Sequence, residues 1–109
     1  MKYKAVKIVI DGYKFSSKLE ARRYIDLKLL EKAGEIKHLE LQPRFELQPK
    51  FIKNGIKYRK IEYVADFLYQ NKDNGITIED SKGFKTPMYQ LKKNLFEYKY
   101  PKLTIREIN

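Results

Sequence analysis

The sequence predicts an α+β, or mixed α/β, fold in which helices pack around a curved sheet as one domain spanning residues 1–109. Three observations support this. β-Branched and aromatic residues dominate three central stretches, helix-capping signals open two further segments, and no Ser/Gly-rich linker divides the chain. Hydrophobic residues make up 42% of the chain and aromatic residues 14%, so the chain has the side chains to bury a core.

The first elements are a hairpin and a helix. Asp11-Gly12 lies between two β-prone runs, Val6 to Ile10 and Tyr13 to Phe15, which is the preferred composition of a two-residue β-turn. Ser17 and Glu20 have the spacing of a capping box, and helix-forming residues continue to Ala33 before Gly34. The sequence therefore predicts a short hairpin followed by a helix.

Three antiparallel strands are expected next, over Leu39 to Phe51, Lys57 to Tyr69 and Ile76 to Lys82. Asn54-Gly55 and the stretch 71–75 supply the turns between them. The six-residue doublet LQPRFE-LQPKFI at 41–52 is too short for a solenoid repeat. We interpret it as a strand pair or as one bent strand, punctuated by its two prolines.

The last elements are a second helix and a closing strand. Thr86 is a suitable N-cap and Pro87 a suitable first helical residue. Apolar residues then recur at helical spacing, and a β-prone run follows Pro101. The helical series is Met88, Leu91, Leu95 and Tyr98, and the strand residues are Leu103, Ile105 and Ile108.

The charge balance indicates an anionic partner. Twenty-four Lys and Arg against fourteen Asp and Glu give a net charge of +10, which favours a nucleic acid or an anionic surface over a small neutral ligand. The absence of cysteine excludes disulfides, zinc ribbons and thiol nucleophiles, and the single His38 excludes a multi-histidine metal site. We expect His38 to be a solvated residue at a strand start. A bound metal would need carboxylate ligands.

No apolar stretch reaches the roughly 18 residues that span a bilayer. The N-terminal residues also lack the long apolar region and small-residue cleavage site of a signal peptide. We therefore expect a soluble, intracellular protein.

The hairpin around residues 71–75 places two carboxylates together. If Gln70 faces Ile76, the numbers of opposed residues sum to 146, so Asp66 lies opposite Asp80. Two opposed carboxylates repel, and a divalent cation would remove that penalty. Lys82 follows on the same face as Asp80, whereas Glu79 points to the other face as a bystander. A one-residue bulge would reverse this assignment and make Glu79 the ligand.

These residues resemble the PD-(D/E)XK nuclease superfamily, in which two acidic residues and a lysine lie on a β-hairpin. Five ordered segments, SSKLEARRY, LELQP, YVADF, EDSKG and LFEYKYP, more closely resemble small phage and prophage endonucleases that are similar to Holliday junction resolvases. The resemblance covers essentially the whole chain. The superfamily's proline before the first aspartate is Ala65 here.

The resemblance implies a restriction-endonuclease-like core, a central mixed sheet flanked by two helices, and Mg²⁺- or Mn²⁺-dependent cleavage of DNA, branched or duplex. It also implies a cytoplasmic location in a bacterial host, a phage or prophage origin and a possible homodimer. By position, Asp66, Asp80 and the Ser81 carbonyl match metal ligands, and Lys82 matches the lysine that orients water or stabilises developing charge. Glu20 matches the glutamate that completes the site, and Gln42 a positioning glutamine.

Each assignment has a structural alternative. Glu20 could serve only the capping box, Asp66 could be an ordinary strand residue, and Asp80 and Lys82 could form a simple ion pair. The basic residues near the site could be solubility charge, although their placement favours phosphate contact. The DNA-contact candidates are Arg22, Arg23, Lys85, Tyr89, Lys92 and Lys93. Competing functions are a non-catalytic nucleic-acid-binding module on the same fold and a basic adaptor that recruits other phage proteins.

Overall fold

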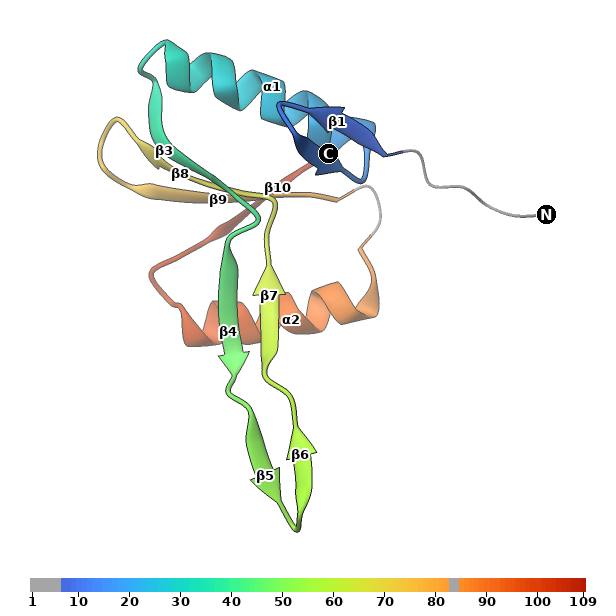
Figure 1. The fold of residues 1–109 in the computed structure, drawn as a ribbon. Helices are drawn as coiled ribbons and strands as arrows, with labels where there is room; N and C mark the ends of the chain where they lie inside the picture. Colours follow the sequence, from blue (N-terminus) through green and yellow to red (C-terminus); the bar gives the residue numbers. More distant parts are fainter. Residues whose placement is uncertain (1–6, 83–84) are drawn as a thin grey trace, which may run out of the picture.

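A computed structural model describes residues 7–82 and 85–109, so Val6 of the expected hairpin lies outside the described residues. Figure 1 shows two helices, α1 (Lys18–Lys32) and α2 (Pro87–Lys99), on opposite sides of a sheet, which confirms the α+β class. The strands are β1 (Ile8–Ile10), β2 (Tyr13–Phe15), β3 (Ile36–Leu41), β4 (Arg44–Gln48), β5 (Phe51–Lys53), β6 (Ile56–Tyr58), β7 (Ile61–Val64), β8 (Phe67–Asn71), β9 (Ile76–Ser81) and β10 (Ile105–Ile108).

The largest sheet has four strands in the order β10-β9-β8-β3. β3, β8 and β9 pair antiparallel, as predicted, whereas β10 runs parallel to β9 and makes the sheet mixed. The parallel pairing is possible because α2 lies between β9 and β10 in the chain and carries it back across the sheet.

The first two long strands predicted from sequence are each broken into three. The segment Leu39 to Phe51 becomes β3, β4 and β5, and Lys57 to Tyr69 becomes β6, β7 and β8. β3 ends before Gln42 because this residue has a positive φ of 51° and is followed by a proline. β4 ends before Pro49 because proline has no N–H to continue the ladder. The expectation of unbroken strands was therefore wrong, and the bent-strand interpretation of the LQP doublet is confirmed.

These broken strands form one long bent ladder. β3 pairs with β8, β4 with β7 and β5 with β6, and the ladder turns at Asn54-Gly55. Both turn residues have positive φ, 52° and 75°, which is the backbone geometry that Asn-Gly adopts readily. The predicted turn at this position is confirmed, and Figure 1 shows β5 and β6 extending beyond the rest of the fold.

The N-terminal hairpin and both helix caps are also confirmed. β1 and β2 pair antiparallel around Asp11-Gly12. Ser17 accepts a hydrogen bond from the Glu20 N–H at 3.1 Å, and Thr86 accepts one from the Tyr89 N–H at 3.1 Å. Each cap satisfies a backbone donor in the first turn of its helix and fixes where the helix begins.

Two apolar cores lie on the two faces of the four-stranded sheet. The core beneath α1 includes Phe67 and Tyr69 of β8, whereas the core above α2 includes Ile78 of β9. The remaining buried members of the first core are Phe15, Ala21, Tyr24, Leu27 and Ile36, and those of the second are Tyr63, Ala65, Tyr89, Phe96 and Ile105. Alternate residues of the β8–β9 hairpin thus serve different cores.

Helix α2 uses a face that its apolar series does not mark. Tyr89 and Phe96 are buried against the sheet, whereas the series with helical spacing is exposed. That series is Met88, Leu91, Leu95 and Tyr98. In the part of the chain that is described, neither helix has the length and apolar content that a bilayer crossing requires.

Candidate active site

The two candidate carboxylates flank the β8–β9 pairing. Phe67 faces Glu79 and Leu68 faces Ile78, so the predicted register is confirmed and no bulge displaces Asp80. Asp66 stands at the bend between β7 and β8, where its N–H donates to the Glu79 carbonyl at 3.1 Å. The hairpin therefore carries its pairing one residue beyond β8 and brings Asp66 to the strand that bears Asp80.

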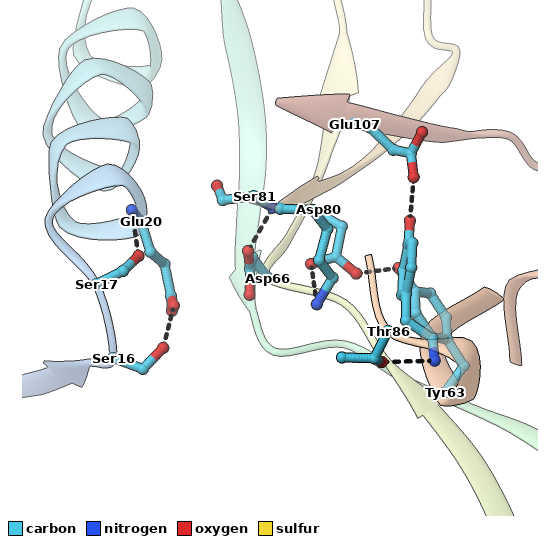
Figure 2. Close-up of polar contacts among 11 residues, drawn as sticks. Ser16, Ser17, Glu20, Tyr63, Asp66, Asp80, Ser81, Thr86 and Glu107 are labelled. Atoms are coloured by element: carbon cyan, nitrogen blue, oxygen red, sulfur yellow. Dashed lines mark hydrogen bonds and ion pairs between the residues drawn. The ribbon is translucent and has the colours of Figure 1, made fainter. Parts of the chain in front are cut away.

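Asp66 lies at the centre of the candidate site, between Glu20 and Asp80 (Figure 2). Its Oδ2 accepts a hydrogen bond from the Ser81 N–H at 2.6 Å. Burial raises the pKa of Asp66 to about 7, the Ser81 N–H opposes that shift, and the negative charges of Asp80 and Glu20 add to it. A carboxyl group in this state is poised to exchange its proton for a cation near neutral pH.

Asp80 is 1% exposed and is held by two side chains. The Tyr63 hydroxyl donates to its Oδ2 at 2.5 Å, and the Lys82 Nζ lies 3.3 Å from its Oδ1 as an ion pair. Among the described residues, nothing donates a hydrogen bond to Oδ1, because the lysine contact lacks hydrogen-bond geometry. Asp80 thus presents a buried carboxylate oxygen with unused acceptor capacity.

The Lys82 ammonium lies over the face of an aromatic ring. Its Nζ lies 4.7 Å from the centre of the Tyr89 ring, and its backbone N–H donates to the Ile108 carbonyl at 3.0 Å. Tyr89 is 7% exposed, and its hydroxyl donates to Glu107 at 2.7 Å. Tyr89, one of the candidate DNA contacts, therefore has its ring packed in the core, where it supports Lys82, and its contact with DNA stays a prediction.

Glu20 approaches the site from the first turn of α1. Its backbone makes the predicted cap bond to Ser17, while its carboxylate Oε2 accepts from the Ser16 hydroxyl at 3.1 Å. Glu20, Gln42 and Asp66 line one open groove of about 410 Å³. The capping and site roles of Glu20 are therefore compatible, because the cap uses the backbone and leaves the carboxylate facing the groove.

The donor set fits a hard divalent cation held by few protein ligands. Within residues 7–82 and 85–109, no three acidic or histidine side chains gather as a ready-made metal cluster. The Asp66 and Asp80 carboxylates supply hard oxygen donors, and the Ser81 N–H is bonded to Asp66. A metal contact by the Ser81 carbonyl stays a prediction. Mg²⁺ commonly takes one or two carboxylates and completes its shell with water and phosphate oxygens, so such a set is sufficient.

Glu79 has a structural role that the sequence did not reveal. It is completely buried and accepts two hydrogen bonds of 2.7 Å from Arg23, together with one from the Tyr69 hydroxyl. This bidentate pair raises the pKa of Arg23 further. The prediction that Glu79 points to the other face from Asp80 is confirmed, and on that face it anchors α1 to β9. This pair engages Nε and Nη2 of Arg23, and contact of Arg23 with DNA stays a prediction.

The other basic candidates differ in their exposure and in their ion-pair partners. Lys85 and Lys93 both pair with Glu107, at 3.1 and 3.4 Å. Arg22 is exposed and Lys92 half-buried. Their contact with DNA stays a prediction. His38 is exposed, as expected, but it lies within β3 with a φ of 59° rather than at its start.

Two site residues were missed by sequence reasoning. Tyr63 follows no motif that links it to Asp80, and the contact depends on the bend between β7 and β8. Glu107 lies beside Asp80 through the β9–β10 pairing, and a parallel register has no turn from which it can be read. The Tyr89, Lys85 and Lys93 contacts lower the pKa of Glu107 and keep it ionised.

No curated protein and no solved structure matches this chain. Residues 1–108 match the profile of one protein family, described as "protein of unknown function (DUF1064)". Because the match covers nearly the whole chain, this protein belongs to the DUF1064 family.

Proposed function

We propose that this chain is a divalent-metal-dependent DNA endonuclease of the PD-(D/E)XK type that hydrolyses phosphodiester bonds in branched or otherwise structured DNA. The single observation that carries the proposal is the arrangement of Asp66, Asp80 and Lys82 at one end of the β8–β9 hairpin. Asp80 Oδ1 lies 3.3 Å from the Lys82 ammonium but accepts no hydrogen bond from the described residues, so it keeps acceptor capacity that a metal ion can use.

The residues have distinct chemical roles in this proposal. A bound Mg²⁺ or Mn²⁺ supplies Lewis acidity toward the phosphoryl oxygen and lowers the pKa of water. Asp66 and Asp80 hold the ion, and Tyr63 fixes the orientation of the Asp80 carboxylate through Oδ2 while leaving Oδ1 for binding. Lys82 places a positive charge 3.3 Å from that oxygen, where it neutralises charge that develops on the scissile phosphate.

The architecture supports the same proposal. A mixed four-stranded sheet with helices on both faces, and an acidic hairpin between them, is what a restriction-endonuclease-like core requires. Glu20 enters from α1 across the groove that Asp66 lines, where a carboxylate can act on the site through water. A symmetric substrate such as a four-way junction favours a homodimer with two equivalent sites.

Two observations favour a second candidate, a nucleic-acid-binding module without catalysis. Asp80 is already bound by Tyr63 and Lys82, and the described residues contain no cluster of three acidic side chains. In that case Lys82 neutralises Asp80 permanently, and binding to DNA depends on salt but not on metal.

Cleavage by matched variants separates the two candidates. Wild-type protein and Asp80→Asn would be purified identically and incubated with supercoiled plasmid and a four-way junction, each with Mg²⁺, Mn²⁺ or EDTA. The endonuclease predicts metal-dependent cleavage that falls at least 100-fold in Asp80→Asn, corresponding to roughly 2.7 kcal/mol of transition-state stabilisation. Asp26→Asn is the control because Asp26 is an exposed carboxylate on α1.

Metal binding provides a readout that does not depend on turnover. Isothermal titration with Mn²⁺ should give a binding isotherm for wild type and Asp26→Asn, and none for Asp80→Asn. Equal cleavage by wild type and Asp80→Asn would remove the site assignment. DNA binding without any metal isotherm or cleavage would establish the binding module instead.

A further inference from the structure

The β5–β6 hairpin forms an arm that the proposed site does not use. All six of its strand residues, Phe51–Lys53 and Ile56–Tyr58, are exposed, and none belongs to either apolar core. Figure 1 shows the arm projecting beyond α2 and away from the four-stranded sheet. An isolated two-stranded hairpin is at best marginally stable in water. Its exposed apolar side chains are therefore better explained by contact with a binding partner than by packing within the fold.

All the charged residues of the arm are basic. Residues 50–60 contain five basic residues and no acidic residue. Lys60 pairs with Glu62 at 3.5 Å, whereas the other four make no ion pair with any residue that the structure describes. These four are Lys50, Lys53, Lys57 and Arg59. These four charges are therefore not neutralised by an ion pair with any described residue.

Aromatic and basic side chains are combined on this arm. The Phe51 and Tyr58 rings stack with centroids 4.6 Å apart and planes 5° apart. Lys53 faces Ile56 two pairs further along, on the same side of the ladder. Ile52 and Lys57 face each other on the opposite side. Each side of the arm thus offers a cation next to an apolar surface.

The charge pattern selects among possible occupants. A second copy pairing arm to arm would bring like charges together in an isologous contact, which is unfavourable. A polyanion with flat apolar groups matches both features, because phosphates take the cations and sugars or bases take the rings. A nucleic acid has both, and its negative charge is regularly spaced.

We propose that the β5–β6 arm is a second nucleic-acid contact that binds the backbone of the substrate some distance from the reacting phosphate. Gly55 lies eleven positions before Asp66, and at about 3.3 Å per step this path spans at most about 36 Å. That reach corresponds to about one turn of B-form DNA. Binding by the arm does not depend on the Asp66 and Asp80 carboxylates.

Salt dependence of binding tests the proposal without catalysis. Affinity for a 30-base-pair duplex would be measured by fluorescence anisotropy in EDTA at several salt concentrations. The triple variant Lys53→Gln, Lys57→Gln, Arg59→Gln should bind more weakly, and its slope of log affinity against log salt should shrink by about 2 to 3. The control, Lys28→Gln, Lys32→Gln, Lys72→Gln, removes the same charge from exposed positions remote from the arm.

Two further measurements test whether a nucleic acid is the partner of the arm. Wild-type affinity should rise with duplex length and level off once the duplex exceeds about one turn, whereas the triple variant should show no such rise. Phe51→Ala with Tyr58→Ala should weaken binding at unchanged salt slope. An unchanged salt slope in the triple variant overturns the proposal. The proposal is also overturned if the triple substitution weakens binding to anionic vesicles but not to DNA, or if it changes only self-association. The triple variant made on an Asp80→Asn background should show the same reduction in salt slope, so loss of cleavage and loss of arm binding are separate outcomes.

Discussion

Neutralising Asp66 should stabilise the metal-free protein at neutral pH. Burial and nearby negative charge raise the pKa of this carboxyl from 3.8 to about 7, so the ionised form is disfavoured in the folded state. Asp66→Asn removes that charge while its amide oxygen can still accept from the Ser81 N–H. We therefore expect the variant to unfold at a higher urea concentration than wild type.

The size of the effect follows from the pKa shift. About three pKa units at 1.36 kcal/mol each set a ceiling of about 4 kcal/mol. Asp66 keeps contact with solvent, which screens its charge, so the expected gain is about 1 to 2 kcal/mol. For a domain of this length, that corresponds to roughly 5 to 10 °C in melting temperature.

The gain should depend on pH in a defined direction. Between the unfolded pKa near 4 and the folded pKa near 7, the folded state binds the Asp66 proton more tightly than the unfolded state does. The contribution of this group to wild-type stability is therefore present at pH 4 and lost as the pH rises through 7. The advantage of Asp66→Asn should be small at pH 4.5 and reach its plateau above pH 7.

Urea unfolding in EDTA at pH 4.5, 6, 7 and 8 measures this difference, with Asp26→Asn as the exposed control. Added metal should instead stabilise wild type relative to the variant. At ten times its Kd, Mn²⁺ should stabilise wild type by about 1.4 kcal/mol and leave Asp66→Asn unchanged. The reasoning is refuted if Asp66→Asn is no more stable than wild type at pH 8, or if its advantage does not vary with pH.

Three further outcomes are expected. Arg23→Met should cost about 3 to 5 kcal/mol in urea unfolding because it leaves Glu79 charged and buried, and adding Glu79→Gln should recover part of the loss; a cost below 1 kcal/mol would contradict this role. Tyr63→Phe should destabilise the protein by about 1 to 3 kcal/mol by removing a donor to the buried Asp80, and equal stability would show that the hydrogen bond is dispensable. Mn²⁺ binding to wild type should weaken below pH 7 with release of about one proton, measured by calorimetry in two buffers, and proton-free binding would contradict the raised Asp66 pKa.

Local signals in the sequence were sufficient for part of the site. The turn between Asn71 and Gly75 fixes the register of an antiparallel pair, so the approach of Asp66 to Asp80 could be predicted. Ser17 and Thr86 mark helix starts because their oxygens satisfy donors a few residues away. These features depend on short stretches of chain.

Features that depend on distant segments were not predictable. The parallel pairing that sets Glu107 beside Asp80 leaves no turn signature, and the partnership of Arg23 with Glu79 joins residues 56 positions apart. Gln42 takes a positive φ that favours glycine, so its break in the strand has no strong signal of its own. Helical spacing on α2 identified a helix, but the sheet is contacted by Tyr89 and Phe96 instead of the longer apolar series.

The parallel strand β10 has a consequence for the order of folding. The ladder from β3 to β8 can close progressively from Asn54-Gly55, and β9 joins through a short turn, whereas β10 must wait for the loop containing α2 to close. The hairpin bearing both aspartates should thus be formed in the rate-limiting transition state, with β10 docking later. In stopped-flow experiments, Ile78→Val should mainly slow refolding and Ile105→Val should mainly accelerate unfolding; the reverse pattern would place β10 in the nucleus.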